Sequence, residues 1–299
     1  MNPQNTTRIG ILGAGLMGHG IAQAFMMAGF RVSIWDPSES ARSTVKQRIA
    51  EHLALLNQHC PIDVQIVDTL ESCVAGCDLV VEAAPEKLDI KRALLAAIDQ
   101  ANSTCIIATN TSVLRISEIA EGCADPTRVV GTHWWNPPYL IPVVEVVHGE
   151  RTSKAVAERV TEWLKQADKI PVDVLRDVPG FVGNRMQFAL MREAANLVEQ
   201  GICSAETVDL VARMTFGRRL AAVGPLRNAD FIGLDLTSDI LDYLAPSLSN
   251  ATQAPALFRE RVEAGQLGAK SGAGIYDWSG SAREDTETQL LKHLINAQR

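Results

Sequence analysis

The chain has 299 residues, of which 46% are hydrophobic, and its formal net charge at pH 7 is −7. This length suffices for two domains of ordinary size, and the acidic balance argues against nucleic acid or an anionic membrane as a partner. No apolar run approaches the roughly 20 residues that cross a bilayer. The polar residues 1–8 lead directly into an apolar stretch and predict no signal peptide.

The first elements follow the order strand, glycine turn, helix, strand and acid. Residues 8–12 are a short apolar strand, residues 21–28 a helix, and residues 31–35 a second strand that ends at Asp36. Between the first strand and the helix, residues 13–18 have the spacing GxGxxG. This order is typical of a dinucleotide-binding βαβ unit.

Each glycine of this turn has a physical role. Gly13 permits the tight turn, Gly15 lets the backbone approach a pyrophosphate, and Gly18 lets the helix pack on the strand. The exposed amides at the start of the helix, at Leu16 and Met17, then hold the negative charge.

Asp36 lies roughly 20 residues past the turn, where a carboxylate accepts hydrogen bonds from a ribose 2′-hydroxyl. A 2′-phosphate would meet its negative charge, and no arginine follows immediately. The sequence therefore favours NAD over NADP as cofactor.

The next residues alternate between helices and strands. We expect helices at 37–58, 70–74, 90–98 and 116–120, and strands at 64–67, 79–81, 105–108 and 129–133. Ser38 is placed to cap the first of these helices. Such alternation predicts an α/β fold with a parallel, doubly wound sheet, in which ligands lie beyond the carboxyl ends of the strands. Those ends carry 13–18, Asp36, 82–86, 110–112 and 133–136.

The second half of the chain changes in character. A helix is expected at 154–169 and one more strand at 171–175, followed by helices within 186–198, 208–214 and 231–244 and a loop around 246–255. No further strand-like run occurs before 274–276. We therefore predict a Rossmann-type nucleotide-binding domain, residues 1–181, and an all-helical domain, residues 182–299, for substrate and dimerisation.

The stretch from 131 to 147 predicts a hairpin, with its turn at Asn136-Pro137-Pro138. When the stretch folds back on itself, its centre falls at Tyr139. His133 and Glu145 are equidistant from that centre, so they can lie side by side. A carboxylate beside an imidazole fixes the ring tautomer and tunes the ring as a general base near neutral pH.

The six cysteines show no CxxC pair and no dense framework. This usage is typical of reduced thiols and predicts a cytoplasmic protein. Cys73 and Cys77 have helical spacing, but no paired Cys or His ligand stands nearby. We therefore expect no metal site, and we expect His19, His52 and His59 to be bystanders.

Seven segments, in this order and approximate spacing, together resemble the 3-hydroxyacyl-CoA dehydrogenase family. They are GAGLMGHGIA at 13–22, VVEAAPEKLDIK at 80–91, NTSVLRISEIA at 110–120, GTHWWNPPYLIPVVEVV at 131–147, DVPGFVGNR at 177–185, VGPLRNADFIGLD at 223–235 and KSGAGIYDW at 270–278. The resemblance covers essentially the whole chain. It implies hydride transfer between NAD and a secondary alcohol, and a homodimer formed through the helical domain.

The resemblance also implies roles for single positions. His133 matches the catalytic histidine, Glu145 its supporting carboxylate, Ser112 a serine that hydrogen-bonds the substrate oxygen, and Asn184 an asparagine that completes the site. The positions that match cofactor contacts are Glu86, Lys91, Asn136 and Lys270.

Three departures from the family weaken the case for a CoA thioester as substrate. His52 and His59 stand where the CoA enzymes have a serine and a lysine that hold CoA, in a hairpin cut short at Cys60-Pro61. Trp134-Trp135 replaces Phe-Phe, and VGPLR at 223–227 replaces Met-Gly-Pro-Phe-Glu. The sequence is more similar to the branch that oxidises free hydroxy compounds, among them carnitine, gulonate and a pyridine-derived alcohol or aldehyde.

A free acid substrate needs a cation for its carboxylate, most suitably an arginine. Arg218, Arg219 and Arg227 lie near the 223–227 segment, and Arg219 and Arg227 are the candidates we select. A solvated surface position fits each of them as well.

We therefore expect an NAD-dependent oxidoreductase of a small hydroxy acid. Two alternatives stay open, a short-chain 3-hydroxyacyl-CoA dehydrogenase and a catalytically silent NAD-binding structural protein. Structural roles also stay open for single residues: a helix cap for Ser112, a tie between domains for Asn184, a surface charge for Lys91 and packing for Trp134 and Trp135. The sequence names neither the substrate nor its stereochemistry.

Overall fold

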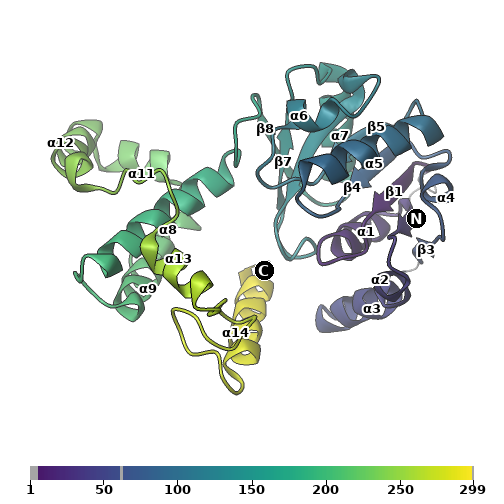
Figure 1. Cartoon of the computed structure of the whole chain (residues 1–299). Helices are drawn as coiled ribbons and strands as arrows, with labels where there is room; N and C mark the ends of the chain where they lie inside the picture. The colour runs from purple at the N-terminus through teal and green to yellow at the C-terminus, as the bar shows by residue number, and fades with distance from the viewer. Residues whose placement is uncertain (1–5, 61–62, 298–299) are drawn as a thin grey trace. The chain divides into compact units, whose positions relative to one another are not determined.

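A computed structural model describes residues 6–60 and 63–297. Within these residues the chain forms two compact units, one of residues 6–184 with 292–297 and the other Arg185–Leu291 (Figure 1). The extreme N-terminus and Pro61, on which parts of two predictions fall, lie outside the described residues.

The first unit is built around an eight-stranded sheet with the order β3-β2-β1-β4-β5-β6-β7-β8. The strands are β1 (Arg8–Leu12), β2 (Arg31–Trp35), β3 (Gln65–Ile66), β4 (Leu79–Glu82), β5 (Ile106–Thr109), β6 (Val129–Trp134), β7 (Val143–Val147) and β8 (Ile170–Val174). Neighbouring strands are parallel, except that β6 and β7 form the predicted antiparallel hairpin. The predicted doubly wound fold is confirmed, and strand boundaries differ from the predictions by a residue or two.

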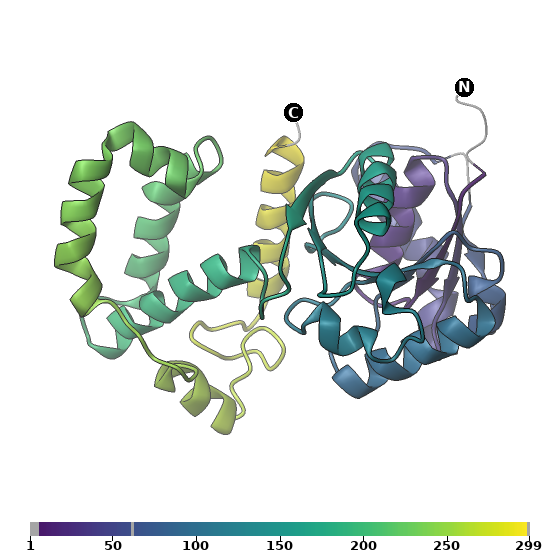
Figure 2. The same ribbon diagram turned by 90° about the horizontal axis from the view of Figure 1, so that it is seen from above.

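Helices cover both faces of this sheet (Figure 2). One face packs against α1 (Gly18–Met27), α3 (Val45–Leu55) and α7 (Lys154–Gln166), and the other against α4 (Leu70–Val74), α5 (Leu88–Ala101) and α6 (Ile116–Ala120). Successive strand residues point to opposite faces, so Ile11 joins the first core and Leu12 the second. A buried core on each face of the sheet thus holds the strands, and with them the edge where the parallel strands end, in place.

The single helix predicted at 37–58 is wrong in one respect, because it consists of α2 (Glu39–Ser43) and α3, which meet at Thr44. Ser38 caps α2 as predicted, since its hydroxyl accepts a hydrogen bond from the Ala41 amide at 3.3 Å. The Thr44 hydroxyl bonds back to the Ala41 carbonyl at 3.2 Å. Such local bonds compete with helix continuation.

The second unit is helical. The elements that lie in it wholly or for the most part are α8 (Gly183–Glu199), α9 (Ala205–Met214), α10 (Phe216–Leu220), α11 (Pro225–Ile232), α12 (Leu234–Leu244), the 3-10 turn η2 (Ala245–Ser247), α13 (Ala256–Glu263) and α14 (Ala282–Ala297). The helix predicted at 231–244 breaks at Gly233, whose φ of 107° is a conformation that favours glycine. At the strand-like run near residue 274, only isolated bridges form, between Gly268 and Ala273 and between Ala273 and Asp277.

This unit leaves much of its apolar surface open. Among residues 185–291, Ala195 alone is a buried hydrophobic residue. Leu226, Phe231 and Tyr243 are 84%, 86% and 85% exposed. Apolar surface of this extent in a folded protein usually marks an interaction site.

In the part of the chain that the structure describes, no helix combines the length and apolar character needed to cross a membrane. Within the same residues, no three His, Cys, Asp or Glu side chains gather as a metal ion would require. The six cysteines are free thiols.

Candidate active site

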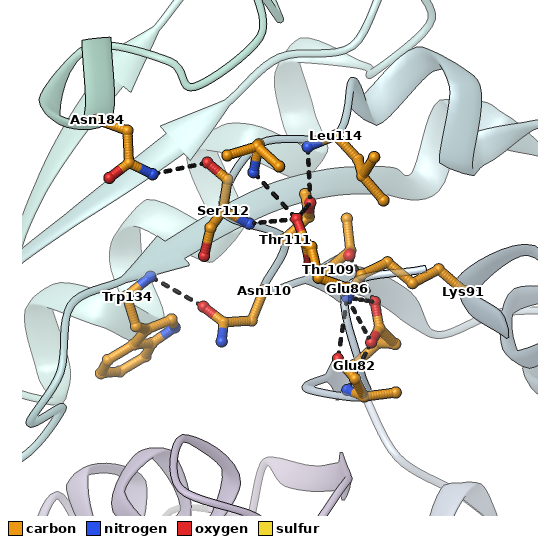
Figure 3. A network of polar contacts seen from close by, with 12 residues as sticks. Glu82, Glu86, Lys91, Thr109, Asn110, Thr111, Ser112, Leu114, Trp134 and Asn184 are labelled. Atoms are coloured by element: carbon orange, nitrogen blue, oxygen red, sulfur yellow. Dashed lines mark hydrogen bonds and ion pairs between the residues drawn. The ribbon is translucent and has the colours of Figure 1, made fainter. Parts of the chain in front are cut away.

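Polar residues gather where the parallel strands of the first unit end. The glycine turn follows β1, Asp36 follows β2, Glu82 ends β4, Asn110 follows β5, and His133 is the next-to-last residue of β6. The Asn110 side chain accepts a hydrogen bond from the Trp134 amide at 3.0 Å, which ties the ends of β5 and β6 together (Figure 3). The polar residues predicted from the sequence therefore lie at one edge of the sheet.

His133 and Glu145 lie directly opposite each other in the β6–β7 pair. His133 Nδ1 is 2.6 Å from Glu145 Oε2, and the two residues are only 4% and 3% exposed. Glu145 Oε1 accepts hydrogen bonds from the amides of Val182 (3.0 Å) and Gly183 (3.1 Å), where α8 begins. The prediction that His133 and Glu145 lie side by side is confirmed.

The surroundings keep Glu145 ionised. Burial by itself raises the pKa of Glu145, but hydrogen bonds from His133 and from two backbone amides outweigh it, so the pKa lies below its ordinary value. A charged carboxylate favours the tautomer with the proton on Nδ1 and leaves Nε2 with its lone pair. The ring centroids of Trp135 and Phe181 lie 4.9 and 5.7 Å from that of His133, and His133 Nε2 has no hydrogen-bond partner among residues 6–60 and 63–297.

Glu86 holds the loop that follows β5. Its Oε1 accepts hydrogen bonds from the amides of Ser112 (2.9 Å) and Val113 (3.0 Å) and from the Thr111 hydroxyl (Figure 3). Asn184 Nδ2 donates to the Ser112 carbonyl at 2.9 Å. These bonds use the backbone of Ser112, and within the described parts of the chain its hydroxyl has no partner.

The helix-cap alternative for Ser112 is wrong. The α6 helix begins at Ile116, and Arg115 occupies its N-cap position. The hydroxyl that accepts a hydrogen bond from the Leu114 amide, at 3.1 Å, belongs to Thr111. The side chain of Ser112 therefore remains available for a ligand.

A buried ionic network lies behind this loop. Lys91 Nζ is 2.9 and 3.0 Å from the two carboxylate oxygens of Glu82, 3.3 Å from the Ala84 carbonyl and 3.4 Å from Glu86 Oε2. Thr109 donates to Glu82 Oε2 at 2.6 Å. Lys91 is 0% exposed, so the alternative of a surface charge is wrong.

The same network sets the charge of Glu86. Burial raises the pKa of Glu86, but hydrogen bonds from the Thr111 hydroxyl and the loop amides, together with the charge of Lys91, outweigh it and lower the pKa. The carboxylate is therefore ionised when it holds the Ser112 loop.

The glycine turn fits a dinucleotide. Gly13 has a φ of 112°, and a Cβ there would lie 2.6 Å from a backbone oxygen. A Cβ on Gly18 would lie 1.8 Å from the Gly13 carbonyl, whereas one on Gly15 would meet nothing within 4 Å. At the start of α1, Met17 is the N-cap residue and no side chain caps its amides, and Leu16 is exposed. The turn thus offers open backbone amides in front of Gly15, as a pyrophosphate requires.

Asp36 is tied to this turn, because its Oδ2 accepts a hydrogen bond from the Ala14 amide at 2.8 Å. Two arginines that the sequence reasoning missed lie here as well. Arg42 donates to the Asp36 carbonyl at 2.6 Å, and Arg48 donates to the Ala14 carbonyl at 2.7 Å. Both belong to the α2–α3 region, where an arginine between apolar helix positions is expected to face solvent. The linear sequence therefore gave no signal that Arg42 reaches Asp36 or that Arg48 reaches the glycine turn.

The remaining predicted residues fall into two groups. Asn136 is exposed in the turn after β6, and its peptide bond to Pro137 is cis. Arg219, Arg227 and Lys270 belong to the second compact unit, so their roles stay predictions.

Of the histidines expected to be bystanders, two lie close to this edge of the sheet. His19 Nδ1 lies 2.6 Å from the Gly15 carbonyl. His52 stacks on Tyr139 with the ring centroids 4.0 Å apart.

Comparison with known proteins decides the family. The model of the 3-hydroxyacyl-CoA dehydrogenase NAD-binding domain matches residues 8–178, and the model of the C-terminal domain of these enzymes matches residues 180–278. The chain belongs to the 3-hydroxyacyl-CoA dehydrogenase family. It is an NAD-dependent dehydrogenase that acts on CH–OH groups, as predicted.

Several relatives are similar over nearly the full chain. The 5-formyl-3-hydroxy-2-methylpyridine 4-carboxylate 5-dehydrogenase of Mesorhizobium japonicum is 32% identical, covering 97% of this chain and 97% of the relative. L-carnitine dehydrogenase of Streptomyces coelicolor is 36% identical over 88% and 86%, and a probable 3-hydroxybutyryl-CoA dehydrogenase of Bacillus subtilis is 35% identical over 91% and 97%. A crystal structure of a 5-formyl-3-hydroxy-2-methylpyridine 4-carboxylic acid 5-dehydrogenase matches with a TM-score of 0.93 and 31% identity, over 99% of this chain and 98% of that one.

Proposed function

We propose that this family member oxidises the secondary alcohol of a small hydroxy acid that is not attached to coenzyme A, in a reversible reaction. The observation that carries the proposal is the buried His133–Glu145 pair, with Nδ1 bound to the carboxylate and Nε2 free. A general base needs such an arrangement, in which one ring nitrogen is fixed and the other can take a proton.

The chain's own groups have distinct roles in this reaction. His133 Nε2 takes the hydroxyl proton, and Glu145 stabilises the imidazolium that forms. The Ser112 hydroxyl and the Asn184 amide hydrogen-bond the substrate oxygen as it becomes a carbonyl oxygen. When bound, NAD supplies the hydride acceptor, C4 of its nicotinamide. A positioned general base contributes typically ~10²–10⁴-fold to the rate.

We assign residues 1–181 to NAD binding and residues 182–299 to substrate binding and dimerisation. The turn amides at Leu16 and Met17 would hold the pyrophosphate, and Asp36 the adenosine ribose. Asn136 and Lys270 complete the proposed cofactor contacts. Glu86 and Lys91 join this set, and the complete burial of Lys91 supports an action through the Ser112 loop.

The relatives favour a free acid as substrate. Two of those named above carry the names of free carboxylate compounds, carnitine and a pyridine carboxylate. The third is named for 3-hydroxybutyryl-CoA, so a short-chain acyl-CoA substrate is the second candidate. In the first candidate, Arg219 or Arg227 receives the substrate carboxylate.

A substrate panel tests the proposal. NADH absorbance is followed with the secondary alcohols L-carnitine, gulonate and 3-hydroxybutyrate, with a hydroxymethyl-pyridine carboxylate as a primary alcohol, and with 3-hydroxybutyryl-CoA. We expect the highest kcat/KM for a free acid, with NAD preferred over NADP. A higher kcat/KM for the CoA ester would establish the second candidate. NAD binding without turnover of any compound would favour the silent structural alternative and overturn the proposal.

Single variants then test the carboxylate contacts. Arg219→Met and Arg227→Met are assayed separately with the free acid that turns over best. We expect a raised KM in at least one of them, because a charge-assisted hydrogen bond is lost. An unchanged KM in both would remove the two arginines from the site.

We further propose that the protein is a cytoplasmic homodimer formed through the helical unit. The exposed side chains of Leu226, Phe231 and Tyr243 support a partner surface in that unit, and the free thiols support a reducing compartment. Analytical ultracentrifugation should give twice the mass of one chain, and a monomer at micromolar concentration would contradict the dimer.

A further inference from the structure

The turn between β6 and β7, residues 135–142, separates the two residues of the catalytic pair in the sequence. Here we call it the β6–β7 turn. Lys169, which is not part of the turn, binds it: its Nζ donates to the Pro138 carbonyl at 2.7 Å and to the Ile141 carbonyl at 3.2 Å. Among the described residues, no carboxylate lies within ion-pair distance of this ammonium group. Its charge is therefore directed at the turn.

The end of α7 determines the position of Lys169. The Asp168 amide bonds to the Lys165 carbonyl at 3.1 Å, and the Lys169 amide bonds to the Leu164 carbonyl at 3.0 Å. Asp168 has a φ of 56°. This is a Schellman motif with a left-handed residue just past the helix. It fixes the backbone of Lys169 immediately before β8, and β8 pairs with β7.

The turn is also held from other sides. His52 of α3 stacks on Tyr139, and a Cβ on Gly20 of α1 would lie only 3.1 Å from Pro138. Lys169 Nζ lies 5.7 Å from the ring centroid of Trp134, within the range of a cation–π contact. Lys169 is the charged member of this set.

We propose that Lys169 is a positioning residue of the dehydrogenase reaction, whose ammonium group fixes the β6–β7 turn and thereby the orientation of His133 and Asn136. This inference rests on the proposed role of His133 as the general base. A single residue, Trp134, links the turn to His133, and a displacement of about 1 Å at reacting groups can cost on the order of 10²-fold in rate.

The charge state of Lys169 gives the proposal a pH signature. Burial lowers the pKa of Lys169 to about 8, while Asp168 beside it acts in the opposite direction. Burial raises the pKa of Tyr139 in the turn above its ordinary value, and burial lowers the pKa of His52 behind it to about 4. These two groups thus keep one charge state between pH 7 and 9, as does Glu145 with its lowered pKa.

Two variants separate charge from packing. Lys169→Met keeps an unbranched apolar stem but removes the donors, whereas Lys169→Arg keeps a charge and N–H donors at every accessible pH. In the oxidation direction, we expect kcat of Lys169→Met to fall about 10–10²-fold, with the Kd for NAD within about threefold of wild type. Lys169→Arg should retain kcat within about threefold. Lys165→Met, on the exposed side of the same helix turn, is the matched control and should match wild type.

The pH profile is the decisive readout. In wild type, kcat should fall above about pH 8 as Lys169 loses its proton, because charge-assisted hydrogen bonds are roughly twice as strong as neutral ones. In Lys169→Arg this alkaline fall should be absent up to about pH 10. An alkaline limb at the same pH in both proteins, or a wild-type kcat in Lys169→Met, would overturn the proposal.

Hydrogen exchange provides a readout that needs no substrate. The amides of Leu140 and Ile141 both donate to the Pro137 carbonyl. Lys169→Met should speed exchange in a peptide covering residues 135–142 and leave residues 8–12 unchanged, and Lys169→Arg should restore protection. Unchanged exchange in Lys169→Met would overturn the positioning role alone. Absence of turnover in wild type would overturn the proposed function, and the exchange result would still decide whether Lys169 holds the turn.

Discussion

Two buried acid–base pairs lie at the same edge of the sheet, and they differ in what they leave free. Lys91 is enclosed by Glu82, the Ala84 carbonyl and Glu86, so its ammonium donors all face acceptors. His133 engages Glu145 through one ring nitrogen only. The first pair is saturated, and the second retains one lone pair.

This difference indicates that the first pair has a structural role and that the second can take part in the reaction. Removing charges from water costs several kcal/mol per ion, which a buried pair offsets only when its remaining hydrogen bonds are made. Glu82 and Lys91 meet this condition, and the contact of Lys91 with Glu86 connects them to the loop at Ser112. The His133–Glu145 pair has an incomplete set of bonds, which is what proton transfer to a ligand requires.

The largest expected effect comes from removing the free nitrogen. His133→Ala should lower kcat by ~10²–10⁴-fold, the usual contribution of a general base. The Kd for NAD, measured by titration calorimetry, should stay close to wild type, because the hydrogen bond and ring contacts of His133 are to Glu145, Trp135 and Phe181 and not to the glycine turn. If His133→Ala kept most of its turnover, His133 would not be the general base, and the two pairs would not differ in function.

Lys91→Met tests the saturated pair. We expect the free energy of unfolding to fall by about 3–5 kcal/mol, because Glu82 is left as a buried and uncompensated charge. The double variant Glu82→Gln/Lys91→Met should recover most of this loss, since no buried charge of the pair remains. Denaturant unfolding followed by circular dichroism measures both. Equal losses in the single and double variants would show that packing, not charge, stabilises this network.

The two pairs also differ in how far the sequence predicted them. The neighbourhood of His133 and Glu145 followed from counting residues around Tyr139, because an antiparallel hairpin obeys a fixed pairing rule. The burial of Lys91 did not follow, because a lysine near the start of an amphipathic helix usually faces solvent. Its partner Glu82 ends β4, and the fold of the chain between β4 and α5 brings the two side chains together.

Similar reasons account for the other gaps. The parallel, doubly wound sheet followed from the alternation of elements, but the break at Thr44 did not, because the apolar periodicity continues through it. Arg48 and Lys169 act on backbone carbonyls of distant turns. Carbonyl acceptors exist at every residue, so the sequence carries no mark of which one a side chain will reach.

Glu145→Gln should have an intermediate effect. A neutral amide supports the imidazolium less well than a carboxylate, and hydrogen bonds to charged groups contribute about 1.5–3 kcal/mol. We therefore expect kcat to fall about 10–10²-fold. The pH dependence of stability supplies a second readout.

The sign of that pH dependence follows from the lowered pKa of Glu145. A carboxyl whose pKa is lower in the folded state stabilises the fold above the unfolded pKa, roughly 4.3, and this contribution is lost as the pH falls through the folded pKa. The difference in unfolding free energy between wild type and Glu145→Gln should therefore shrink below about pH 4. A constant difference from pH 7 to pH 3 would contradict an ionised Glu145.

The smallest expected effect belongs to Glu86, whose carboxylate lies between the two regions and is one-third exposed. In Glu86→Gln the amide oxygen can still accept the hydrogen bonds of the Ser112 and Val113 amides, and only the charge facing Lys91 is lost. Solvent screens that charge, so we expect a loss of stability below about 1 kcal/mol and a change in kcat of a fewfold at most. Glu71→Gln, at an exposed position of α4, is the matched control.

The size of the Glu86 effect decides how far the saturated network extends. If the loop needs only an acceptor, Glu86→Gln behaves like its control and Glu82 alone balances Lys91. If the loss approaches that of Lys91→Met, all three charges form one unit, and the Ser112 loop depends on the whole of it. In that case Glu86→Gln combined with Lys91→Met should cost less than the sum of the single losses, because groups in one network are not additive.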